Sequence, residues 1–131
     1  MTPDGLVSCL SSHGPKETMD RLIAAVAERG MMILARVDYA GAAAKVGMEL
    51  RQTEVVLFGN PKAGTPLMQA VQTIGIDLPL KALVWQDGEG RTWLGYNDPK
   101  WLAKRHGVAA GMEQTLGAMT DVLAAIAKAA T

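Results

Sequence analysis

This 131-residue sequence contains a single cysteine and carries no formal net charge at pH 7. Cys9 is the only cysteine, so no disulfide can close within the chain, which fits a reducing compartment. Thirteen basic side chains balance thirteen acidic ones, so no net field attracts nucleic acid or an anionic membrane surface. We therefore expect neither a nucleic-acid partner nor a membrane partner.

Long apolar runs and a signal peptide are also missing. Apolar residues make up 49% of the chain, yet no uninterrupted run approaches the roughly 20 residues of a membrane-spanning helix. Near the N-terminus, Asp4 stands where a secretory signal carries positive charge, and the apolar segment that follows is short and polar. Unless a leader has already been removed, this is mature sequence, and we expect a cytoplasmic protein.

Ligands for metals and attachment sites for cofactors are few. Cys9, His13 and His106 are the only soft ligands apart from the methionines, whereas a closed zinc site has four ligands. Covalent haem attachment would need a CxxCH motif, which the sequence lacks. We predict no metal and no cofactor, and we interpret Cys9 and the eight methionines as core-filling residues.

Apolar spacing predicts the elements of the first half. Residues 5–13 read as a strand, and residues 15–29 as a helix that begins at Pro15 and ends before Gly30. The segment 31–39 is rich in β-formers and apolar on both faces. This composition predicts a central strand between layers covered by helices or by another subunit.

The second half alternates short helices and strands. Asp38 can cap a short helix that ends at Gly47, and Asp98 can cap one over 99–106. Strands are predicted at 53–58, 80–86 and 91–96, the last two joined by the hairpin turn DGEG, with a further helix at 65–75. A final helix at about 109–129 carries a narrow apolar stripe of Met112, Leu116, Met119, Leu123 and Ile126.

The loop FGNPKAGTPL, residues 58–67, has two glycines at the spacing of a nucleotide-binding loop. Lys62 lies inside the loop instead of after the second glycine, and Pro66 removes an N–H that a phosphate could use. We interpret the loop as a turn at Asn60-Pro61, followed by a helix that Thr65 caps and Pro66 begins. A weaker anion or carboxylate site at that helix start is the alternative.

Domain organisation follows from what is absent between the elements. No repeat, low-complexity tract or long linker divides the chain, so residues 1–131 form one domain. Helices interleaved among the early strands favour a parallel sheet, whereas the DGEG hairpin favours an antiparallel one. Local pattern leaves both arrangements open.

Three segments carry a family resemblance: TEVVLFGNPKAGTPLM, DLPLKALVW and YNDPKWLAKRHG. In this order and spacing they resemble the domain of unknown function 302 family over roughly residues 5–107. The resemblance implies an α+β fold with a curved, mainly antiparallel sheet of about five strands and helices mostly on one face. Its order is strand, helix, four strands, helix, with short helices inserted at 40–47 and 65–75. It also implies small bacterial or archaeal proteins, often dimers, without an established reaction.

One position departs from the family pattern. After the second strand the family usually has an aspartate followed by histidine, whereas here Asp38 is followed by Tyr39. If that histidine transfers protons or binds metal in relatives, this chain lacks that activity or uses the tyrosine in another way.

The polar candidates lie at strand ends and loop starts. Lys81 stands in an apolar strand, alternating with Leu83 and Trp85, so it is either exposed at an edge or buried with a partner. Our first hypothesis is a homo-oligomeric binding module for a small anionic or carbonyl-bearing molecule. Its ligand-binding residues would be Asn60, Lys62, Thr65 and Lys81.

Two other hypotheses remain open. An acid–base enzyme of the hydrolase or isomerase type could use Lys81 as base or electrostatic stabiliser and Tyr39 or Asp98 as acid, so whether the chain is an enzyme stays uncertain. A protein-interaction or assembly domain would need no small-molecule site. Surplus apolar surface on segment 31–39, the final helix and the tryptophans predicts a homodimer.

Overall fold

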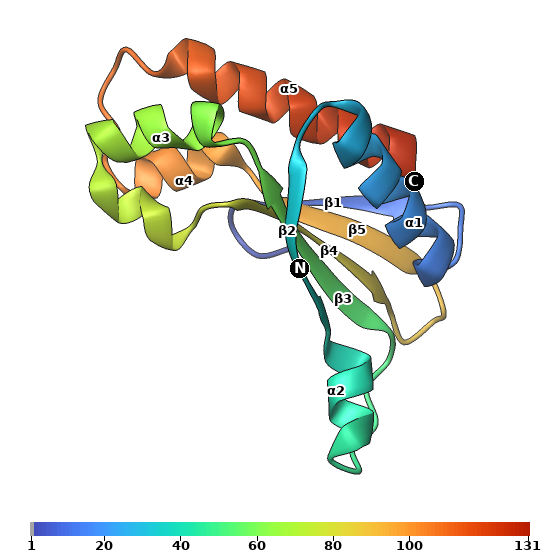
Figure 1. Ribbon diagram of the computed structural model, residues 1–131. Helices are drawn as coiled ribbons and strands as arrows, with labels where there is room; N and C mark the ends of the chain where they lie inside the picture. Colours follow the sequence, from blue (N-terminus) through green and yellow to red (C-terminus); the bar gives the residue numbers. More distant parts are fainter. Residues whose placement is uncertain (1) are drawn as a thin grey trace.

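Five strands form a single antiparallel sheet in this computed structural model, which describes residues 2–131 (Figure 1). The strand order across the sheet is β1-β5-β4-β3-β2. The strands are β1 (Leu6–Ser11), β2 (Met32–Asp38), β3 (Thr53–Gly59), β4 (Leu80–Gln86) and β5 (Thr92–Asn97). Every neighbouring pair is antiparallel, so the α+β class is confirmed and the parallel alternative is wrong.

The helices lie over one face of the sheet and at its two ends. They are α1 (Pro15–Glu28), α2 (Tyr39–Lys45), α3 (Pro61–Ala70), α4 (Pro99–Arg105), α5 (Glu113–Ala130) and the short 3-10 helix η1 (Gln72–Ile76). Figure 1 shows α1 and α5 above the sheet, α3 and α4 at one end, and α2 projecting from the other end. No helix among residues 2–131 is long and apolar enough to span a bilayer.

The core lies between the sheet and the helices α1 and α5. Side chains alternate between the two faces of a strand, and on β3 it is Val56 and Phe58 that point to the helices and are fully buried. They pack in one cluster with Leu22 of α1 and Leu123 of α5. On the opposite face, apolar side chains are only partly buried; these include Val55, Leu57, Leu83, Trp85 and Trp93.

Helix ends follow the signals in the sequence at three places. Pro15 stands at the start of α1, and Gly30 just past its end has φ +70°, a conformation that costs glycine little. The Asp98 carboxylate accepts the Lys100 N–H at the start of α4. The predicted boundaries of α1 and α4 are therefore confirmed.

The helix expected to begin at Pro66 begins five residues earlier, at Pro61. Asn60 is its N-cap, with the side-chain oxygen 2.9 Å from the Lys62 nitrogen, and Pro61 needs no N–H at the first position. Pro66 lies inside α3, and Thr65 does not cap it. Our interpretation of Asn60-Pro61 as a simple turn was wrong because the same two residues also form a strong helix start.

The segment expected to be a central strand is an edge strand. Among the described residues β2 pairs with β3 alone, and six of its seven residues are exposed. Ile33 alone in this strand packs against the core. The prediction was wrong because apolar residues on both faces of a strand show only that burial of these faces is favourable. They do not show whether the same chain or another chain covers them.

Candidate functional site

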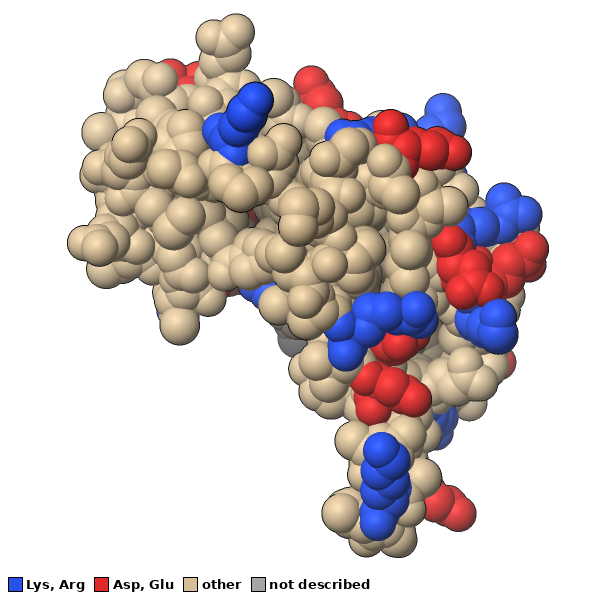
Figure 2. All heavy atoms as spheres, in the orientation of Figure 1, with Lys and Arg blue, Asp and Glu red and all other residues tan. Residues whose placement is uncertain are grey.

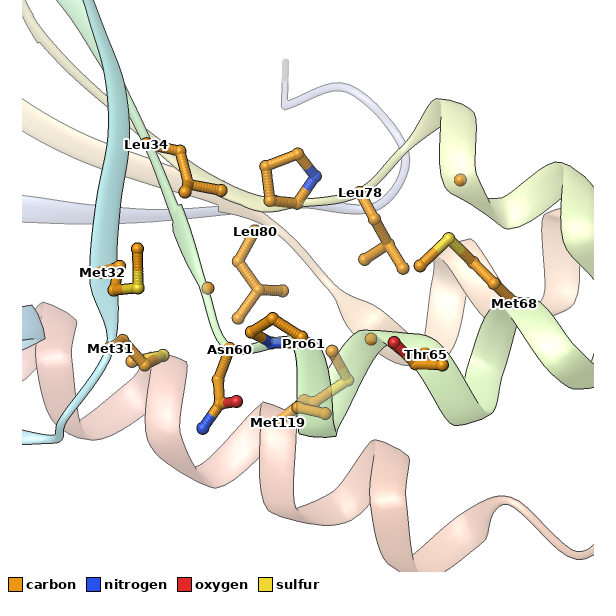
Figure 3. A pocket seen from close by; sticks show the side chains of 15 residues that line it. Met31, Met32, Leu34, Asn60, Pro61, Thr65, Met68, Leu78, Leu80 and Met119 are labelled. Carbon is orange, nitrogen blue, oxygen red and sulfur yellow. The ribbon is translucent and has the colours of Figure 1, made fainter.

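An apolar cavity of about 340 Å³ lies where β2 and β4 begin and β3 ends (Figure 3). Its size falls within the range of small-molecule pockets, which begins at about 300 Å³. Residues from β2, α3, the turn after η1 and α5 line it, among them Met31, Met32, Leu34, Asn60, Pro61, Ala63, Gly64, Thr65, Met68, Leu78, Pro79, Leu80 and Met119. The FGNPK loop therefore forms part of a cavity wall.

Methionine is the most frequent side chain on these walls. Met31, Met32, Met68 and Met119 are four of the eight methionines in the sequence. Met119 is buried, whereas Met32 is 61% exposed, so the methionines run from the interior to the surface. Because the thioether chain is flexible and polarizable, such walls adapt to ligands of different shape.

Among the residues that the structure describes, Asn60 and Thr65 are the only ones with polar side chains that line the cavity. The Asn60 oxygen accepts the Lys62 N–H, which leaves the side-chain N–H groups to donate elsewhere. The Thr65 hydroxyl can both donate and accept. The cavity thus combines apolar walls with a small polar region at the start of α3.

The two lysines predicted for the site lie outside this cavity. Lys62 is exposed on the first turn of α3. The Lys81 amine donates to the carbonyl oxygens of Asp77 and Pro79, at 3.0 and 3.1 Å, and borders a separate void of about 10 Å³. Partial burial lowers the pKa of Lys81, and the charge of Asp77 opposes that effect. Of the four predicted residues, the structure brings Asn60 and Thr65 together.

A charged cluster that sequence reasoning missed holds one wall of the cavity. The Asp77 carboxylate, just after η1, accepts hydrogen bonds from Arg105, at 2.7 and 2.9 Å, and from the ring of His106. The other ring nitrogen of His106 lies 3.0 Å from the Thr73 hydroxyl. These contacts tie η1 to the end of α4. Nothing in the sequence links His106 to a residue 29 positions earlier.

Asp77 makes the stability of this wall depend on pH. Burial would raise the pKa of its carboxyl, but hydrogen bonding by His106 and the charge of Arg105 outweigh burial and hold the pKa below its ordinary value. A carboxyl whose pKa is lower in the folded state stabilises the fold above its unfolded pKa of about 3.9. That contribution is lost as the pH falls through the folded-state pKa.

We expect Asp77→Asn to lower the free energy of unfolding by about 1–2 kcal/mol at pH 7, because it removes a charged partner from Arg105 and His106. The difference from the unmodified protein should shrink towards pH ~2.5, which urea denaturation at both pH values would measure. Asp20→Asn is the control. Its pair with Lys16 is exposed, so it should cost less than about 1 kcal/mol. Equal costs for the two variants at pH 7 would contradict the assignment.

A second cleft, of about 440 Å³, is polar. It lies between the start of α1, β2 and the base of α2, and its lining includes Lys16, Arg36, Asp38 and Glu54. Arg36 and Glu54 pair with each other at 3.1 and 3.2 Å, and Asp38 accepts the Gly41 N–H. Figure 2 shows charged side chains gathered on this side, whereas the surface seen over α3 in the same view is almost free of charge. The charged groups here already have partners.

Residues proposed for acid–base catalysis are dispersed. Tyr39 is the first residue of α2 and is exposed, and Asp98 caps α4. None of the three cavities described above is lined by Lys81 together with either of them. The enzyme hypothesis remains a prediction without a common site.

The fold and its loops can be compared with known proteins. A sequence profile described as "Domain of unknown function DUF302" matches residues 7–126. The chain belongs to the DUF302 family. Its structure is similar to the crystal structure of an uncharacterized conserved DUF302 protein from Bacillus stearothermophilus, with a TM-score of 0.86, 19% identity, and coverage of 98% of this chain and 100% of the other. At this identity the similarity supports the DUF302 fold alone.

Curated relatives of this DUF302 chain are longer proteins. It is 43% identical over 124 residues to proteins named fluoride-specific ion channel FluC 1 from Brucella suis biovar 1 and from Brucella abortus biovar 1. The match covers 95% of this chain but 49% and 46% of those proteins. The chain therefore spans about half the length of the curated relatives it matches, and their name describes the longer proteins.

Proposed function

We propose that this DUF302 protein binds a small, largely apolar molecule that carries a carbonyl group. The observation that supports this proposal is the methionine-lined cavity of about 340 Å³ beside Asn60 and Thr65. Burial of apolar ligand surface there would be favourable by about 25 cal/mol per Å². The side-chain N–H groups of Asn60 and the hydroxyl of Thr65 can donate to the carbonyl oxygen and orient the ligand.

An uncharged ligand fits the lining better than an anion does. No lysine, arginine or histidine lines the cavity, and a buried charge without a partner is costly. Lys62 and Lys81 would have to move to reach a ligand there. We therefore favour the carbonyl-bearing alternative of our first hypothesis over the anionic one.

Filling the cavity tests this proposal. A β-carbon at Gly64 would lie 3.6 Å from Leu78 and 3.8 Å from Met68, so Gly64→Leu places its side chain among the lining residues without a clash at the first atom. The change also favours the helical conformation by up to about 1 kcal/mol. We expect it to weaken binding of the uncharged fluorescent probe N-phenyl-1-naphthylamine at least tenfold, measured by fluorescence titration.

Gly117→Leu is the matched control. Gly117 also lies within a helix, and a β-carbon there would meet nothing within 4 Å. It should leave probe binding unchanged, and the anionic probe 8-anilinonaphthalene-1-sulfonate should bind more weakly than the uncharged one. Equal binding by the Gly64→Leu variant and the unmodified protein would refute the cavity as the binding site.

A homodimer is the second part of the proposal, and exposed surface supports it. The chain has 7740 Å² of accessible surface, whereas a monomer of 13.9 kDa is expected to have roughly 6,700 Å². The surplus of about 1,000 Å² is close to the roughly 800 Å² that each partner contributes to a standard interface. Exposed apolar side chains include Met32, Leu34, Val37, Val46, Met48 and Leu50.

A further inference from the structure

We infer that two copies pair along the outer edge of β2 about a two-fold axis, so that each copy covers the cavity of its partner with residues 39–50. We call residues 39–50 the arm; they comprise α2 and the segment after it. This inference rests on the proposed homodimer and on the proposed cavity, and it names the surface that joins them. The partner then completes the ligand site.

Within its own chain the arm is supported mainly by contacts between α2 and β3. It projects away from the sheet, and α2 buries none of its residues (Figure 1). Its apolar side chains are open to solvent: Val46 is 72%, Met48 66% and Leu50 50% exposed. A seven-residue helix is unstable in water unless it packs against something. The arm therefore exposes apolar surface that a second molecule can bury, and packing against that molecule would stabilise its short helix.

The edge of β2 is open to a second strand. Edge strands that avoid pairing usually carry lysine, proline, inward-pointing charge or a β-bulge. β2 contains neither lysine nor proline, and its one arginine, Arg36, is paired with Glu54 of the same chain. The pairing with β3 shifts register between Ile33 and Ala35, which leaves Ala35–Asp38 as a regular stretch for pairing.

Symmetry brings the arm and the cavity together. When two identical strands pair antiparallel, the end of each lies beside the beginning of the other. The beginning of β2 carries Met32 and Leu34, which line the cavity, and its end leads directly into the arm. The arm of one copy therefore extends over the cavity of the other, apolar surface against apolar surface. Within one chain the arm and the cavity lie at opposite ends of β2.

Cysteine cross-linking tests this arrangement in the 131-residue chain. In a Cys9→Ser background, Leu34→Cys and Tyr39→Cys are introduced together. When Ala35–Asp38 pairs with its two-fold mate, position 34 of one copy lies opposite position 39 of the other. Within one chain these positions are separated by about 16 Å of strand. A disulfide requires α-carbons within about 7 Å, so a bond between positions 34 and 39 must join two chains. We expect oxidation to convert most of the protein into a covalent dimer on non-reducing gels.

The control pair is Leu10→Cys with Tyr39→Cys in the same background. Leu10 lies on β1, at the other edge of the sheet, and is 55% exposed, as Leu34 is 54% exposed. This pair, and each single variant, should give at least tenfold less covalent dimer. Equal cross-linking by the control pair would overturn the inference.

Light scattering separates the two possible failures. A mass of twice 13.9 kDa without a bond between positions 34 and 39 would overturn the β2 interface and leave the homodimer proposal intact. A mass of 13.9 kDa at high concentration would overturn both. Probe binding that persists in the monomer would still support the cavity proposal.

Discussion

Replacing Phe58 with alanine is expected to lower the free energy of unfolding by about 3–5 kcal/mol. Phe58 is fully buried and lies on the helix-facing side of β3. It is also the residue before Gly59 and Asn60, which line the cavity. The substitution removes a large apolar side chain from a packed core and leaves a void that the antiparallel neighbours of β3 cannot close.

Urea denaturation monitored by circular dichroism measures this loss. Leu10→Ala is the control, because Leu10 is on a strand but 55% exposed, and it should cost less than about 1 kcal/mol. A cost for Phe58→Ala below about 1.5 kcal/mol would mean that Phe58 is not packed as the structure places it. Probe binding is also expected to weaken in the Phe58→Ala variant, because the end of β3 that lines the cavity loses its support.

Gly5→Ala is expected to have the second largest effect, a loss of about 2–4 kcal/mol. Gly5 has φ +78°, which disfavours any residue with a β-carbon. An added β-carbon would also lie 2.3 Å from the ring of Trp101, which therefore has to move. The Gly5 carbonyl accepts the Asp98 N–H at 2.8 Å, so a shift of Gly5 would also disturb the start of α4.

Gly30→Ala separates the two causes. Gly30 has φ +70°, and a β-carbon there would meet nothing within 4 Å, so only the backbone strain of about 1–2 kcal/mol remains. The difference between the two variants, measured by urea denaturation, reports the clash with Trp101. Equal costs would show that the indole ring moves aside freely.

The sequence predicted those elements whose ends carry strong local signals. Pro15, Gly30 and Asp98 set the ends of α1 and α4 by capping and backbone preference, and the predicted boundaries of these two helices depend on them. Antiparallel pairing was not decided by local pattern, because it depends on contacts between distant residues; the family resemblance supplied it. The place of β2 at the edge was missed for the same reason.

The candidate site was predicted only in part. Asn60 and Thr65 were found because the FGNPK loop is unusual in sequence. The methionines were interpreted as core filler, but four of them line the cavity. Because the core and the cavity wall are both apolar, composition alone does not distinguish a methionine of one from a methionine of the other. The contact of Asp77 with His106 joins residues 29 positions apart, which spacing alone does not reveal.

The most direct test of the cavity proposal is NMR of the methionine methyl groups during titration with N-phenyl-1-naphthylamine. The protein would be labelled with ¹³C at these methyls, and single Met→Leu variants would assign the signals. We predict saturable shifts for the four cavity methionines, Met31, Met32, Met68 and Met119. Met112 lies outside both cavities, and Met19 borders the polar cleft. The methyl signals of these two residues should therefore not shift. Shifts at Met19 without shifts at the four cavity methionines, or no saturable shift at all, would contradict the proposal.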